Sequence, residues 1–158
     1  MRVLLVEPEY RKGSEKLASE CRRALASINT KGKKDDDRLW YPPLGLMKLA
    51  SFHKQRGDEV HFVVGCDRSV LPLGLFDRSL WDRVYISTLF TFHFDTIVKT
   101  INFYKEAVGG TNSKIFVGGI MSTLMPQDIF NETGIFPISG ILTSAKQIGI
   151  DDDTNIDQ

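Results

Sequence analysis

The chain has 158 residues, enough for one ordinary globular domain, and 42% of them are hydrophobic, so it can bury a core without disulfides. Its 20 basic and 20 acidic residues cancel, which excludes a strong overall field toward nucleic acid or an anionic membrane. No apolar run approaches the roughly 20 residues that span a bilayer. We therefore predict a cytoplasmic protein with no nucleic-acid partner and no membrane partner.

The N-terminal part of the sequence predicts a strand, a helix and a polar loop. Residues 2–6 (RVLLV) are apolar after Arg2, a pattern typical of a strand buried on both faces of a parallel sheet. Apolar residues recur at helical spacing over residues 17–28 and predict a helix, which Ser14 can cap at its N-terminus. Residues 29–38 contain no apolar side chain and predict a solvated loop.

A second helix is predicted after Pro43, since proline suits the first turn of a helix. One side of this helix carries Leu46, Leu49, Ala50 and His53. Gly57 ends it, and residues 59–64 predict the second strand. The two strands and the helices between them therefore form a β-α-β unit.

Strands and helices continue to alternate toward the C-terminus. We predict a third strand within residues 81–87, a helix over residues 94–108 and a fourth strand at residues 114–117. A short helix at residues 126–132 precedes a fifth strand near residues 138–142.

This alternation predicts an α/β fold, a flavodoxin-like (Rossmann-like) three-layer sandwich with a five-stranded parallel sheet. The domain is expected to cover residues 1–145, and residues 146–158 are expected to be a polar tail or an interdomain linker. In such a sheet a ligand binds beyond the carboxyl ends of the strands, where the strand order reverses.

The residues after the first strand argue against nucleotide binding. A dinucleotide fold needs G-x-G-x-x-G at this point, whereas the chain has Glu7, Pro8 and Glu9, whose carboxylates would repel a phosphate. A phosphoacceptor receiver domain would need an aspartate where Ser87 stands. Both classes are therefore disfavoured.

The other residues at the strand ends can be explained either by contact with a ligand or by a purely structural role. Gly118 and Gly119 can let a flat ligand lie against bare backbone, or can form a tight turn. Ser87, Thr88 and Thr91 can hydrogen-bond a ligand or cap a helix. Aromatic residues near two of these loops can wall an apolar pocket or fill the core; they are Trp40, Tyr41, Phe90, Phe92 and Phe94.

His93 is the only histidine expected near the ligand edge. It could ligate a metal or carry a proton, but an exposed position in the first turn of a helix explains it more simply. Glu7 and Glu9 lack an accompanying nucleophile or metal-ligand spacing. We therefore predict no catalytic residue and no metal ligand in this chain.

Two segments together resemble a known family. The run PPLGL at residues 42–46 opens the second predicted helix and is followed by KQRGDEV at residues 54–60. The fourth strand ends in VGG at residues 117–119, with Pro126 shortly after. This pattern resembles the N-terminal cobalamin (B12)-binding domain of radical S-adenosylmethionine proteins. The resemblance covers roughly residues 2–142.

The resemblance implies a domain that holds cobalamin against the strand ends and presents it to a radical S-adenosylmethionine catalytic domain on the C-terminal side. Many such proteins are methyltransferases. The implied cobalamin contacts are Glu7, Pro8, Glu9, Tyr10, Leu44, Gly45, Ser87, Thr88, Leu89, Phe90, Thr91, Gly118, Gly119 and Ile120.

Two motifs of related proteins are missing from the sequence. There is no D-x-H-x-x-G loop, so a bound cobalamin would lack that lower-axial histidine. There is no C-x-x-x-C-x-x-C, so a 4Fe-4S cluster and S-adenosylmethionine would have to be bound by another domain. We predict a cobalamin-binding module without its catalytic domain. The alternative is an interaction or structural domain of the same fold that binds no cobalamin.

Overall fold

A computed structural model describes residues 1–10, 43–72, 81–151 and 156. The helix predicted after Ser14, the polar loop at residues 29–38, and Trp40 and Tyr41 lie outside these residues.

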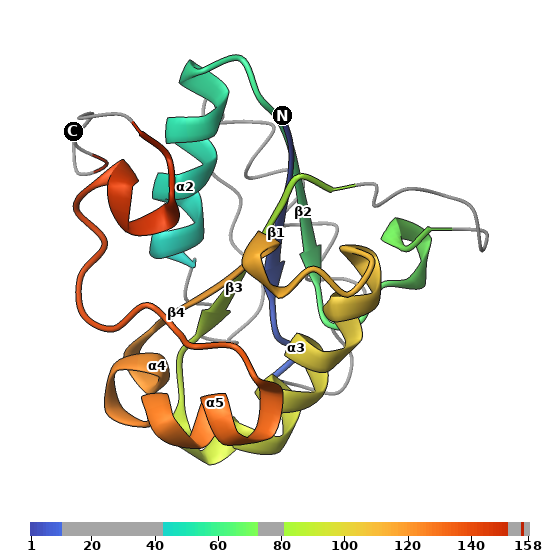
Figure 1. Cartoon of the computed structure of the whole chain (residues 1–158), viewed down its shortest axis with the longest axis vertical. Coiled ribbons are helices and arrows are strands. Elements are labelled where there is room, and N and C mark those ends of the chain that lie inside the picture. Colours follow the sequence, from blue (N-terminus) through green and yellow to red (C-terminus); the bar gives the residue numbers. More distant parts are fainter. Residues whose placement is uncertain (11–42, 73–80, 152–155, 157–158) are drawn as a thin grey trace, which may run out of the picture.

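A parallel sheet forms the centre of the described part of the chain (Figure 1). Its strands are β1 (Arg2–Glu7), β2 (Glu59–Val64), β3 (Arg83–Thr88) and β4 (Ile115–Gly119). They are hydrogen-bonded in the order β2-β1-β3-β4, and every pair is parallel. The α/β class and the first four predicted strands are thus confirmed, and the strand order is compatible with a flavodoxin-like fold.

Alternation along β1 divides the core between the two faces of the sheet. Val3 and Leu5 pack into one apolar cluster, and Leu4 and Val6 pack into the other. All four side chains are fully buried. Because successive side chains of a strand point to opposite faces, an unbroken apolar run requires cover on both sides.

One face of the sheet is covered by α2 (Leu44–Gln55) and by a short 3-10 helix, η4 (Ala145–Ile148). The predicted inner side of α2 is confirmed, since Leu46, Leu49 and Ala50 are buried against the sheet. The helix runs opposite to the strands and ends near the start of β1 (Figure 1). There the amide of Glu59, the first residue of β2, donates to the Met1 carbonyl.

The other face is covered by α3 (Phe94–Ala107), α4 (Ile120–Leu124) and α5 (Pro126–Thr133). The predicted stripe of α3 supplies Ile97 and Ile101, and Met121 and Ile129 come from the two shorter helices. Shorter 3-10 turns complete the described elements: η1 (Arg68–Val70), η2 (Thr91–His93) and η3 (Asn112–Lys114). None of the helices in the described part is long and apolar enough to cross a membrane.

The prediction of a fifth strand is wrong, because the described sheet has four strands. Ile138 makes one isolated parallel bridge beside β4, its amide donating to the Val117 carbonyl at 2.8 Å. Two residues further on, where the next bond to β4 would form, Gly140 adopts a left-handed φ of 82°, which an extended strand does not have. The chain therefore leaves the sheet edge after a single bridge.

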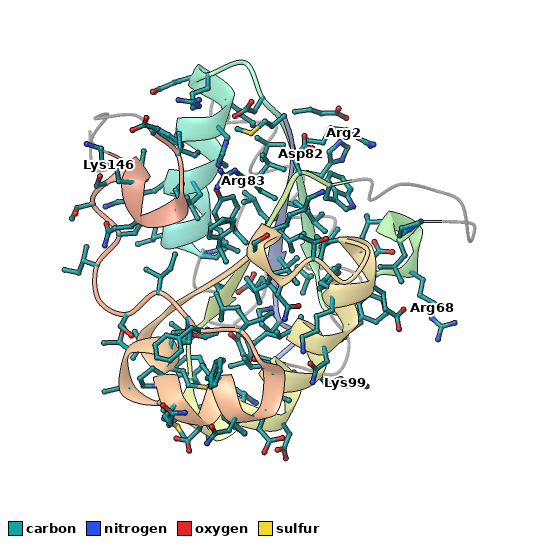
Figure 2. The ribbon with its side chains drawn as sticks, in the orientation of Figure 1. Arg2, Arg68, Asp82, Arg83, Lys99 and Lys146 are labelled. Atoms are coloured by element: carbon teal, nitrogen blue, oxygen red, sulfur yellow. The ribbon has the colours of Figure 1, made fainter. Side chains whose placement is uncertain are left out.

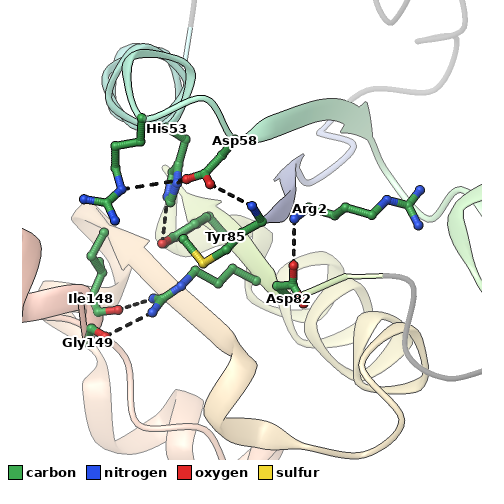
Figure 3. Close-up of polar contacts among 10 residues, drawn as sticks. Arg2, His53, Asp58, Asp82, Tyr85, Ile148 and Gly149 are labelled. Atoms are coloured by element: carbon green, nitrogen blue, oxygen red, sulfur yellow. Dashed lines mark hydrogen bonds and ion pairs between the residues drawn. The ribbon is translucent and has the colours of Figure 1, made fainter. Parts of the chain in front are cut away.

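Three described residues beyond 145 pack into the core, where a polar tail or interdomain linker was expected. Ile148, Ile150 and Ile156 are buried in the same cluster as α2. Arg83 of β3 reaches η4 and donates to the carbonyls of Ile148 and Gly149 (Figures 2 and 3). The packed core therefore extends past the expected domain boundary.

Candidate functional site

The strand order reverses between β1 and β3. The chain passes from β1 to β2 on one side of the sheet, and β3 then pairs with β1 on the other. The connections that leave the carboxyl ends of β1 and β3 therefore diverge, and such a switch point is where parallel α/β sheets bind ligands.

The sequence-predicted contacts lie on this carboxyl side. Glu7 ends β1 and is followed by Pro8, Glu9 and Tyr10; Ser87 and Thr88 end β3 and are followed by Leu89, Phe90 and Thr91; Gly118 and Gly119 end β4; Ile120 opens α4; Leu44 and Gly45 open α2. Because α2 runs opposite to the strands, it begins toward the same side (Figure 1). Their role as ligand contacts stays a prediction.

Tyr10 links the segment after β1 to the segment after β3. Its hydroxyl accepts a hydrogen bond from the Leu89 amide at 3.1 Å. Its ring packs edge-on against Phe90 and lies 5.0 Å from the His93 ring, centroid to centroid. Burial raises the pKa of Tyr10 to about 12, so the phenol is neutral in ordinary buffers. Tyr10 therefore bridges the switch point as an uncharged group.

His93 belongs to an aromatic cluster with Tyr10, Phe90 and Phe92. The Phe90 and Phe92 rings stack at 5.1 Å, and the His93 ring lies 4.6 Å from Phe92. Among the described residues, no group of three or more His, Cys, Asp and Glu side chains could hold a metal ion. His93 therefore contributes to a partly exposed aromatic surface, in which Phe92 is 75% exposed.

Glu7 is the last residue of the inner strand β1 and therefore lies at the switch point. Only 9% of its surface is exposed, and its Oε2 atom is buried without a hydrogen-bond partner. Burial raises the pKa of this carboxyl from 4.5 to about 7. Near neutral pH a large share of Glu7 is therefore protonated and uncharged.

The Thr88 hydroxyl is used inside the protein. It donates to the Gly118 carbonyl at 3.1 Å, accepts from the Ser122 amide at 3.0 Å, and lies 2.7 Å from the Ser122 hydroxyl. Both side chains are buried. Thr88 therefore joins the ends of β3 and β4 to the first turn of α4.

The two glycines after β4 differ in what surrounds them. A Cβ on Gly119 would lie 2.3 Å from the Thr88 carbonyl oxygen, and the residue has a φ of 126°. A Cβ on Gly118 would meet nothing closer than 4.0 Å. Close backbone packing thus accounts for Gly119, whereas Gly118 leaves open backbone at the strand end.

Open surface also lies at the starts of two helices. Leu44 is 66% exposed and Ile120 is 58% exposed. A Cβ on Gly45 would meet nothing within 4 Å. The carboxyl side therefore offers apolar side chains and bare backbone together with the hydroxyl and carboxyl groups of Tyr10 and Glu7.

Ser122 and the unpartnered state of Glu7 were not found from the sequence. Ser122 contacts a residue 34 positions earlier, and no local pattern marks that pairing. A single glutamate after an apolar strand was visible, but its burial depends on neighbouring segments.

The chain matches no protein-family model, and no curated protein matches it at a significant level. The fold and the residues at its carboxyl edge define an α/β protein with a parallel sheet and a candidate ligand site at the switch point.

Proposed function

We propose that this chain is the cobalamin-binding module of a radical S-adenosylmethionine enzyme of the methyltransferase-like kind, present without its catalytic domain. One observation carries the proposal: residues 43–46 and the VGG segment at residues 117–119, far apart in the sequence, both lie on the carboxyl side of one parallel sheet, where Leu44, Gly45, Gly118 and Ile120 are open.

The residues present fit a large, flat, mostly apolar group with amide substituents. Leu44 and Ile120 offer apolar contact, and the backbone at Gly45 and Gly118 carries no side chain that would keep a flat ring away. The unpartnered carboxyl of Glu7 offers a polar contact at the switch point. Gly119 gives no such support, because its close packing against Thr88 already requires a glycine there.

The proposed cofactor would supply the chemistry, and this chain would hold and orient it. When bound, cobalamin would supply methyl-transfer or one-electron chemistry. A partner domain with a 4Fe-4S cluster and S-adenosylmethionine would supply the radical. The residues of this chain would exclude water from one face of the cofactor and hydrogen-bond its periphery.

The test is to mix the purified protein with hydroxocobalamin, remove free cofactor by desalting and record the visible spectrum. We expect a coloured protein, and we expect Gly45→Trp to reduce the retained cobalamin at least about tenfold, because the indole fills open surface. Ser51→Trp, at another exposed position of α2, is the matched control and should retain cobalamin.

A wild-type protein that stays colourless at excess cofactor would overturn the proposal. That result would favour the second candidate, an interaction domain without cobalamin. The exposed apolar side chains on the described surface support this alternative, including Leu124 at 66%, Phe136 at 66% and Ile141 at 77%.

A further inference from the structure

We propose that Glu7 is a ligand-binding residue whose carboxyl, in its neutral form, donates a hydrogen bond to an amide carbonyl oxygen of the ligand at the switch point. The ligand class rests on the proposed function, because the rim of cobalamin carries amide side chains. The position of Glu7 rests on the structure alone.

Glu7 departs from the pattern of its own strand. The four preceding residues of β1 are apolar and fully buried, and each is accounted for by one of the two core clusters. Glu7 ends the strand, and its backbone carbonyl accepts from the Gly65 amide at the end of β2. Its carboxyl therefore stands where the central strand meets the ligand edge.

The other buried polar side chains in the described part have partners. His53 pairs with Asp58 and Tyr85, Thr88 pairs with Ser122, and Thr100 and Thr133 donate to carbonyls in their own helices. Glu7 Oε2 alone among those described lacks a partner. Burying such an atom costs free energy, and a ligand that supplies an acceptor removes that cost.

Burial, and no charged partner among the described residues, governs the protonation of Glu7. Tyr10, on the following segment, interacts electrostatically with Glu7 and is itself neutral. The Glu9 side chain lies beside Gly65 and interacts with Cys66, and Ser87 at the end of β3 carries no charge. No salt bridge to Glu7 occurs among the described residues. With burial as the cause, its pKa rises to about 7, so the proton needed for donation is present below neutral pH.

The experiment measures the affinity for cyanocobalamin by equilibrium dialysis from about pH 5.5 to about pH 8.5, a range that brackets the raised pKa. Wild-type protein is compared with Glu7→Gln, which donates at every pH, and with Glu7→Ala, which cannot donate. Glu106→Gln removes an exposed carboxyl at the far end of α3 and serves as the matched control. Circular dichroism at each pH checks that every variant is folded.

We expect the wild-type Kd to rise by about tenfold per pH unit above about 7. The Kd of Glu7→Gln should stay within a few-fold across the range, and Glu7→Ala should bind about tenfold more weakly than wild type at low pH. Glu106→Gln should follow the wild type.

The results that would contradict the role of Glu7 differ from the result that would contradict the proposed function. Binding by the wild type that does not change with pH, or a Glu7→Gln variant that keeps the wild-type pH dependence, overturns the role of Glu7 alone. Absence of cyanocobalamin binding at every pH overturns the proposed function and this inference with it.

Discussion

Gly119 occupies a position where no side chain fits. Its backbone approaches the Thr88 backbone so closely that a Cβ would overlap the carbonyl oxygen, and its positive φ is one that L-residues rarely adopt. Gly118, one residue earlier, has neither constraint. Adjacent glycines in one motif can therefore serve different purposes, one for packing and one for open surface.

Gly119→Ala should lower the free energy of unfolding by about 3 kcal/mol or more, because the overlap and the strained φ act together. Gly118→Ala is the control and should change it by less than about 1 kcal/mol. Urea unfolding of the two variants measures the difference. Equal losses would show that the closeness of the Gly119 and Thr88 backbones does not set the requirement.

At the scale of elements, η4 is held to the sheet by both apolar and polar contacts. Ala145 and Ile148 are fully buried beside α2. The Arg83 guanidinium lies 5.0 Å from the centre of the Phe116 ring. It also donates hydrogen bonds to the carbonyls of Ile148 and Gly149 at the end of η4 (Figure 3). These contacts make η4 part of the layer that covers the sheet.

Ile148→Ala should lower the free energy of unfolding by between about 2 and 5 kcal/mol, the usual cost of a cavity in a packed core. Ile141→Ala removes the same atoms from a side chain that is 77% exposed and should cost less than about 0.5 kcal/mol. Thermal or urea unfolding compares them. A loss at Ile148 as small as that at Ile141 would mean that η4 contributes little to the stability of the domain.

At the scale of the whole molecule, each end of the sheet carries a buried titratable group. One group lowers the stability of the fold as pH falls, and the other lowers it as pH rises. At the amino end, His53 lies between Asp58, 2.8 Å from its Nδ1, and the Tyr85 hydroxyl, 3.0 Å from its Nε2 (Figure 3). Burial lowers the pKa of His53 despite Asp58. The imidazole of His53 therefore binds a proton more readily in the unfolded chain than in the folded protein. As pH falls below the ordinary pKa of histidine, His53 lowers the stability of the fold.

Glu7, at the carboxyl end of the sheet, lowers the stability of the fold as pH rises. Its pKa is higher in the folded protein, so the folded state holds the proton more tightly, and stability falls as pH rises from 4.5 to about 7. This difference in pKa corresponds to about 3 kcal/mol.

Glu7→Gln should therefore gain stability relative to the wild type by up to about 3 kcal/mol as pH rises through this interval, because glutamine has no proton to lose. Urea unfolding of both proteins at each pH gives the difference, in which the contribution of His53 cancels. A constant difference across the interval would contradict the burial of a neutral carboxyl at this position.

The sequence by itself determined the α/β class, the four strands, α2, α3 and α5, because apolar periodicity reports which faces of an element must be buried. It also indicated which loops follow the strands, and hence where a ligand edge would lie. The candidate contacts were those that the family resemblance implied at these loops and at the start of the second predicted helix.

Only the tertiary structure decided what depends on distant neighbours. The expected strand at residues 138–142 makes one bridge, Ile148, Ile150 and Ile156 join the core, and Thr88 pairs with Ser122. Gly119 is required because Thr88 lies against it, and the pKa of Glu7 is raised because its side chain is buried. Local pattern reports how apolar a face is, whereas contact distance and desolvation are set by segments that the fold alone brings together.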